Sequence, residues 1–166
     1  MSQFIQFKVN LDTFINDLQK IIKANNEQVD MLLKIKEKNF TNFVKPMQLL
    51  DEELELFFTP LSHVNSVNNS EKTQKVYAES LPIITQYSTE LSQNIEIYNI
   101  YKEIQQRESN ELNYAQNRVL ELNIQGFELS GAHLSFEVKK QLADINLKKS
   151  DLSNNFAQNL LDSTNA

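Results

Sequence analysis

Glycine, proline, cysteine and tryptophan are scarce or missing in this chain of 166 residues, which has 2 Gly, 3 Pro, no Cys and no Trp. Sheets and tight turns use glycine and proline at bends, because glycine reaches positive φ and proline fixes φ. The composition therefore disfavours a β-sandwich, a β-barrel or a doubly wound α/β fold. Two glycines are also too few for a phosphate-binding glycine-rich loop. The lack of cysteine excludes disulfides, zinc sites with cysteine ligands and thiol nucleophiles.

The charge balance and the hydropathy of the chain exclude further classes of protein. The formal net charge is −6, whereas proteins that bind nucleic acids normally carry a basic face. No apolar run approaches the roughly 20 residues of a membrane span. Residues 1–10 lack the basic start, apolar stretch and cleavage site of a secretory signal. The sequence therefore predicts a cytoplasmic protein that binds neither nucleic acid nor membrane.

Apolar residues recur at steps of three and four from Leu11 almost to the end of the chain. This period is typical of helices that bury one face. Interruptions near residues 39–42, 65–70 and 105–110, and a short connection at residues 132–134, divide the pattern into segments. Asn10, Thr41, Ser70 and Ser135 are residue types that cap helix starts. We therefore predict an all-α fold, one domain over residues 1–166 in the form of an antiparallel bundle of about five helices. Their apolar stripes run over residues 11–33, 43–64, 76–104, 112–129 and 138–160.

Two prolines lie inside expected helices, Pro60 in the second and Pro82 in the third. An interior proline donates no hydrogen bond and its ring clashes with the carbonyl group four residues before it. Kinks are therefore expected near Leu56 and Ala78.

The two glycines have different expected roles. Gly126 lies in a heptad seam of the fourth helix, where glycine costs about 1 kcal/mol relative to alanine. We expect that a neighbouring backbone approaches closely at this position. Gly131 is expected to end the same helix, because glycine directly after a last turn adopts left-handed φ without penalty.

The two histidines do not form a recognisable metal motif. His63 and His133 are 70 positions apart, and neither belongs to an H-E-x-x-H helix. A hydrolytic zinc needs about three protein ligands, so we expect structural roles instead. His63 is expected to have a capping or packing role, and His133 to reach a helix end or a partner surface. A site in which the two meet is the alternative.

Other residues with possible chemistry also have simpler interpretations. The acidic run Asp51, Glu52, Glu53 and Glu55 alternates with apolar Leu50, Leu54 and Phe57, so most of its carboxylates are expected on a solvated face rather than in a catalytic pair. The tyrosines of the third helix are expected in the core or at its rim, with peptide contact as the alternative. No serine lies in a G-x-S-x-G turn. We predict no catalytic residue, no metal ligand and no cofactor in this chain.

Two stretches carry a family resemblance. Residues 56–104, LFFTPLSHVNSVNNSEKTQKVYAESLPIITQYSTELSQNIEIYNIYKEI, resemble the amino-terminal helical region of the M3 family of zinc metallo-oligopeptidases. The resemblance is to the bacterial oligopeptidase A branch, whose relatives include thimet oligopeptidase and neurolysin. Residues 126–134, GFELSGAHL, resemble the family's helix-ending F-x-L-S-G-x-x-L element, and SNNFAQNLLDST at 153–164 also fits. The similarity spans residues 56–164, and the part before it agrees mainly in helix spacing.

The resemblance implies that this chain is the amino-terminal part of a longer peptidase and ends before the active site. In that family an H-E-x-x-H helix binds zinc far downstream, and two helical lobes enclose a channel for short unstructured peptides. The implied partners are the downstream catalytic domain and short peptides, and the zinc belongs to that domain. Residues 61–65 and 127–134 match the family but inherit only structural roles, a kinked-helix end and a helix cap with its connection.

A stand-alone helical interaction module is the second hypothesis, and an enzyme in its own right is the third. An isolated lobe is expected to expose an apolar patch of several hundred Å², far larger than scattered surface apolar residues. An open reading frame that continues into an H-E-x-x-H helix would favour the peptidase, and a stop codon after residue 166 the module.

Overall fold

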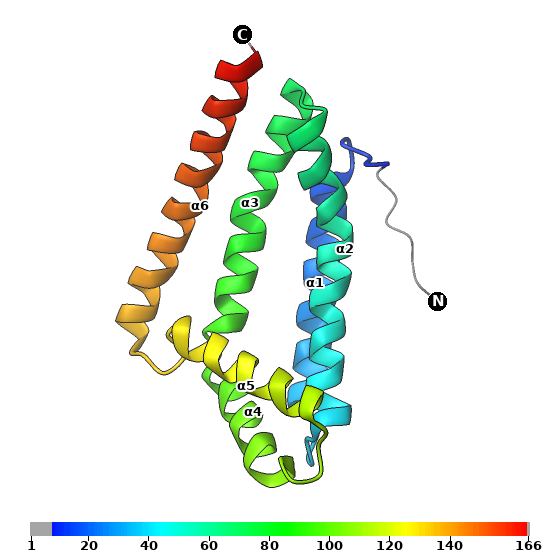
Figure 1. Cartoon of the computed structure of the whole chain (residues 1–166), viewed down its shortest axis with the longest axis vertical. Helices are drawn as coiled ribbons and strands as arrows, with labels where there is room; N and C mark the ends of the chain where they lie inside the picture. The colour runs from blue at the N-terminus through cyan, green and yellow to red at the C-terminus, as the bar shows by residue number, and fades with distance from the viewer. Residues whose placement is uncertain (1–7, 166) are drawn as a thin grey trace.

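The computed structural model describes residues 8–165, and all regular structure in that range is helical. Three long helices lie side by side, and a fourth long helix runs beside α3 on its other side (Figure 1). Two shorter helices fold together at one end, where α5 crosses the ends of α2 and α3 (Figure 1). The elements are α1 (Phe14–Leu33), the π-helical η1 (Phe40–Val44), α2 (Lys45–Val67), α3 (Glu71–Ser92), α4 (Ile95–Glu108), α5 (Tyr114–Leu129) and α6 (Phe136–Asn165). The predicted all-α class is confirmed.

The predicted count of about five helices is too low, because the expected third helix is two helices. Asn94 interrupts it: the Asn94 side chain accepts hydrogen bonds from the backbone N–H groups of Glu96 (2.9 Å) and Ile97 (3.1 Å). An asparagine in this position satisfies backbone donors that have no partner at a helix start. The chain therefore stops α3 at Ser92 and begins α4 at Ile95, and α4 turns away to pack against α5.

Neither interior proline breaks its helix. α2 continues through Pro60 and α3 through Pro82. Pro60 is buried, whereas Pro82 is exposed. Both helices have well over a turn on each side of the proline, so the neighbouring hydrogen bonds hold the helix together where one bond is lost. The kinks at Pro60 and Pro82 stay predictions.

The predicted helix starts are partly right. Ser70 is the N-cap of α3, and its hydroxyl accepts from the Thr73 N–H in a reciprocal capping box. Asn39 caps η1 through the same kind of exchange with Asn42, so the predicted cap at Thr41 is wrong by two residues. The predicted cap at Asn10 is also wrong, because α1 begins at Phe14 after Thr13.

The buried side chains form three clusters along the length of the molecule. One joins Phe14, Leu61 and Val76 from α1, α2 and α3, and a second joins Leu18, Leu54 and Tyr87 from the same helices. The largest cluster lies where α4 and α5 meet the lower ends of α1 and α2, with Tyr101 between the rings of Phe43 (6.1 Å) and Phe127 (5.4 Å). None of the α6 side chains up to residue 164 is buried. The molecule is therefore a packed body of α1–α5 with α6 attached along α3.

Candidate docking groove

An open groove of about 490 Å³ lies between α2, α3 and α5. It lies near the place where α5 crosses the two long helices instead of lying along them (Figure 1). Its lining is mainly apolar and comes from all three helices. The apolar lining residues are Met47, Leu54, Phe58, Ile84, Leu91, Leu122 and Phe127.

Two carboxylates of the acidic run on α2 belong to this groove. Asp51 and Glu55 line it, whereas Glu52 and Glu53 do not. Residues four apart lie on one face of a helix, so Asp51 and Glu55 share the face of α2 that lines the groove. Burial raises the pKa of the Asp51 carboxyl, and the negative charge of Glu55 raises it further. All four residues are exposed overall, as the predicted solvated face requires, although the Asp51 carboxyl is partly shielded from water by the groove.

Two tyrosines lie beneath these carboxylates. Tyr87 is 4% exposed and Tyr101 is 1% exposed. Burial raises the pKa of both phenols, and the negative charge of Asp51 raises it further. The side chain of Asn25 opposes the rise at Tyr87, and that of Gln48 opposes it at Tyr101. Both phenols are therefore neutral hydrogen-bond donors at neutral pH. The hydroxyl of Tyr87 is shielded from solvent and lies beside Asn25 of α1, whose amide group donates to the Leu50 carbonyl oxygen (3.3 Å).

Gly126 also lines the groove, and no backbone in the described part of the chain approaches it closely, so the expected close approach stays a prediction. A Cβ atom added there meets no other atom within 4 Å. The seam of α5 that contains Gly126 faces the open groove, and Leu122 and Leu129 of the same seam are exposed. The buried residues of α5 are Leu120 and Phe127, which lie outside the predicted seam, so the seam is not the most buried face of this helix.

Gly131 ends α5 and starts the turn toward α6. Its φ is +78°, the left-handed region that glycine adopts without strain. The Ala132 N–H donates to the Phe127 carbonyl (2.9 Å) and the Gly131 N–H to the Glu128 carbonyl (3.1 Å), which is the Schellman pattern of helix ends. A Cβ atom here would lie 2.7 Å from Leu134 Cδ1.

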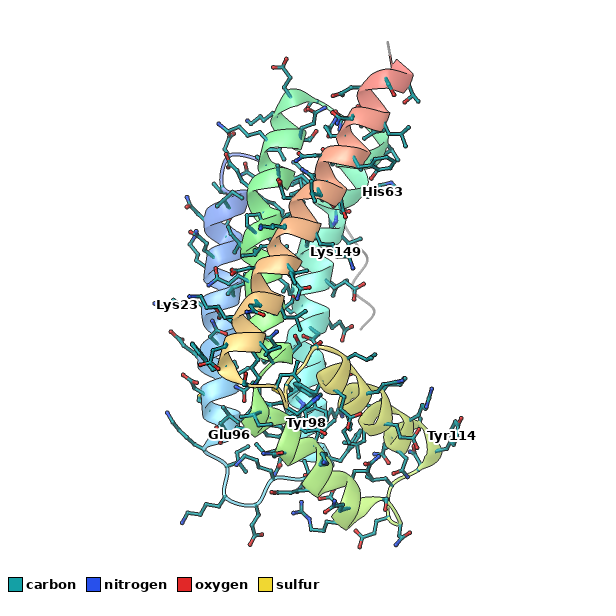
Figure 2. All side chains as sticks on the ribbon, turned by 90° about the vertical axis from the view of Figure 1, so that its left-hand side faces the viewer. Lys23, His63, Glu96, Tyr98, Tyr114 and Lys149 are labelled. Carbon is teal, nitrogen blue, oxygen red and sulfur yellow. The ribbon has the colours of Figure 1, made fainter. Side chains whose placement is uncertain are left out.

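The two histidines lie on different elements. His63 is exposed and lies near the C-terminal end of α2, and its capping or packing role stays a prediction. His133 is exposed in the connection between α5 and α6. Figure 2 shows His63 near the upper end of the molecule, far from that connection. Across residues 8–165 no group of three or more His, Asp or Glu side chains could hold a metal ion.

A second exposed apolar surface runs along α6. We name it the α6 stripe and define it by Val138, Ile145, Leu152 and Phe156, which are 42%, 57%, 67% and 72% exposed. Steps of seven and four residues place these side chains on one face. α6 contacts α3 through a different, polar face, for example by the bond from Thr85 Oγ1 to Ser150 Oγ (3.2 Å). Lys148 and Lys149 lie beside the stripe, and Figure 2 shows Lys149 on α6.

No helix in the described range has the length and apolar character that crossing a membrane requires.

A helical domain with two exposed apolar surfaces, and with no group of metal ligands in its described part, has the properties of a domain that docks onto other protein. The sequence model of the family described as neurolysin/thimet oligopeptidase, N-terminal domain, matches residues 16–139. The chain belongs to this family, the N-terminal domains of M3 oligopeptidases.

Curated relatives agree with this assignment. Oligopeptidase A of Haemophilus influenzae is 31% identical over 148 residues, which are 89% of this chain and 22% of the relative. Oligopeptidase A of Salmonella typhimurium is 33% identical over 127 residues, 76% of this chain and 19% of the relative. Oligopeptidase A of Escherichia coli is 33% identical over 124 residues, 74% of this chain and 18% of the relative. The chain thus spans about a fifth of the length of these relatives.

Proposed function

We propose that this chain is the non-catalytic N-terminal region of a zinc-dependent oligopeptidase, in which it forms a wall of the substrate channel and restricts substrates to short peptides. The observation that carries the proposal is the family match over residues 16–139, in a chain that spans 18% to 22% of relatives named oligopeptidase A. The groove and the α6 stripe supply surfaces by which such a region would pack against a catalytic domain.

The chemistry would belong to the downstream catalytic domain. Bound there, zinc would supply a water activated for attack on a peptide bond. The donors in residues 8–165 do not fit a zinc site, because His63 and His133 are far apart and form no ligand group with acidic side chains. The contribution of this chain is steric: helices that exclude folded polypeptide from the channel. We place the parent enzyme in the cytoplasm, which fractionation of the source cells would test.

A chimaeric enzyme tests this function. Residues 1–166 replace the matching region of the Haemophilus influenzae oligopeptidase A, and cleavage of a short quenched peptide is compared with cleavage of an unfolded protein. We expect the chimaera to cleave only the short peptide, and the 166-residue chain with added zinc to cleave neither. Zinc-dependent turnover by the chain alone would refute the non-catalytic role, and an inactive but folded chimaera would refute the role in the channel.

The stand-alone interaction module remains the second candidate, because the α6 stripe would serve a separate partner equally well. The two candidates differ at the parent locus. A reading frame that continues from residue 166 into an H-E-x-x-H helix supports the peptidase, and a stop codon at that point supports the module.

A further inference from the structure

We infer that the groove between α2, α3 and α5 binds an amphipathic helix from the downstream part of the parent polypeptide, and that a lysine or arginine of this helix contacts Asp51. The inference rests on the proposed function, because it names the partner that covers the groove in the longer enzyme. Two independent features of the groove lead to it.

The first feature is the open space beside the backbone of Gly126 in α5. Glycine inside α5 costs about 1 kcal/mol of helix stability relative to alanine, yet Gly126 makes no close contact that would explain it within the described residues. A missing side chain lets a second backbone approach closely. With apolar side chains of three helices around it, this position fits the close crossing of an apolar helix.

The second feature is uncompensated negative charge. Asp51 and Glu55 lie one helical turn apart at the groove, and within residues 8–165 neither forms an ion pair with a lysine or arginine. The raised pKa of Asp51 shows that burial and Glu55 disfavour its charge. A cation held at this position would reverse that effect, because an opposite charge within a few ångströms favours the ionised carboxylate.

The α6 stripe shows no such features and is flanked by Lys148 and Lys149, so it would select a partner of opposite charge.

Overlapping peptides test the inference on the 166-residue chain itself. We would use labelled peptides of about 20 residues, which form about five helical turns. They would cover the Haemophilus influenzae oligopeptidase A beyond its matching region. Fluorescence anisotropy with the wild-type chain would identify the peptides that bind. We expect at least one to bind, with a lysine or arginine among apolar residues at helical spacing.

Four variants then locate the contact. Asp51→Asn and Gly126→Leu are each expected to weaken binding tenfold or more, the first by removing the charge and the second by filling the groove. Glu52→Gln, on the same helix outside the groove, and Leu152→Gln, on the α6 stripe, are expected to leave binding within twofold. Replacing the basic residue of the peptide by norleucine should weaken binding to the wild type but not to Asp51→Asn, as in a double-mutant cycle.

Thermal unfolding of each variant confirms that it is folded before binding is compared. The inference is overturned if no peptide binds, if binding ignores both Asp51 and Gly126, or if only Leu152→Gln weakens it. An inactive chimaera would refute the channel wall without changing the peptide result. An active chimaera with no peptide bound would leave the proposed function intact and refute this inference alone.

Discussion

Gly126 and Gly131 lie five residues apart around the end of α5, and their surroundings predict opposite effects of the same substitution. At Gly126 a Cβ atom meets nothing within 4 Å, so Gly126→Ala keeps the fold and gains helix propensity. We expect the free energy of unfolding to rise by about 0.5–1 kcal/mol. Urea denaturation measures this, and a loss of stability would show that the groove is occupied or that α5 is arranged differently.

Gly131→Ala is the matched control, and we expect it to lower the free energy of unfolding instead of raising it. The φ of +78° places an alanine in the left-handed region, which costs roughly 1–2 kcal/mol for a residue with a Cβ atom. The new atom would also lie 2.7 Å from Leu134 Cδ1 and 3.2 Å from Leu142 Cδ2, so these side chains must shift. We expect a loss of at least about 1 kcal/mol by the same denaturation experiment. Equal stability of the two alanine variants would contradict both assignments.

We expect the wild-type chain and Asp51→Asn to differ in stability by an amount that depends on pH. Its pKa in the folded chain is raised above the ordinary value of 3.8, so folding disfavours the ionised form and the carboxylate destabilises the native state at neutral pH. Asp51→Asn removes this penalty and is expected to raise the melting temperature at pH 7. As the pH falls through the raised pKa and below 3.8, Asp51 is protonated in both states and the difference between the proteins disappears.

The control for Asp51 is Glu52→Gln, which removes one negative charge from a chain of net charge −6 but lies outside the groove. This control separates the effect of a smaller net negative charge from the effect of removing the partly shielded Asp51 carboxylate. Equal stabilisation by both variants at pH 7, or a difference for Asp51→Asn that persists below pH 3.8, would contradict the local origin.

At the scale of elements, Asn94 decides where α3 ends and α4 begins. Its side chain accepts from two backbone N–H groups, so Asn94→Ala leaves these donors without their cap. We expect a loss of about 1 kcal/mol of stability, measured by urea denaturation. Asn159→Ala, at an exposed position inside α6, is the control and is expected to change stability little. A neutral result at Asn94 would show that packing alone fixes the α3–α4 boundary.

The same residue shows how far the sequence predicts this fold. Helical class follows from the apolar period and the scarcity of glycine, and the Ser70 cap follows a clear polar break. Asn94 was missed because apolar residues continue at helical spacing on both sides of it. The groove could not be predicted, since it depends on the angle at which α5 crosses α2 and α3. A usable signal was present in Asp51 and Glu55, whose spacing of four places them on one helix face.

At the scale of the whole molecule, burial is distributed unevenly. The three core clusters draw on α1–α5, while α6 contributes no buried side chain up to residue 164. α6 is held to α3 mainly by polar contacts, such as Lys139 Nζ to the Gln93 carbonyl (3.0 Å) and Thr85 to Ser150 (3.2 Å). A neutral hydrogen bond contributes roughly 0.5–1.5 kcal/mol in net terms, and one to a charged group somewhat more. The apolar stripe of α6 contributes nothing while it is exposed.

Native-state hydrogen exchange should therefore divide the chain into two levels of protection. Amides of α2 and α4 are expected to exchange through global unfolding, and amides of α6 through local opening at a much lower free energy. Leu120, fully buried in the largest cluster, supplies a check, because Leu120→Ala should cost about 2–5 kcal/mol. That loss should lower protection in α2 and α4 while leaving α6 nearly unchanged. Equal protection of α6 and α2 in the wild type would contradict the division.

Within the chimaeric enzyme, covering of the α6 stripe should raise protection of α6 toward that of the core, which links the exposed surface to docking.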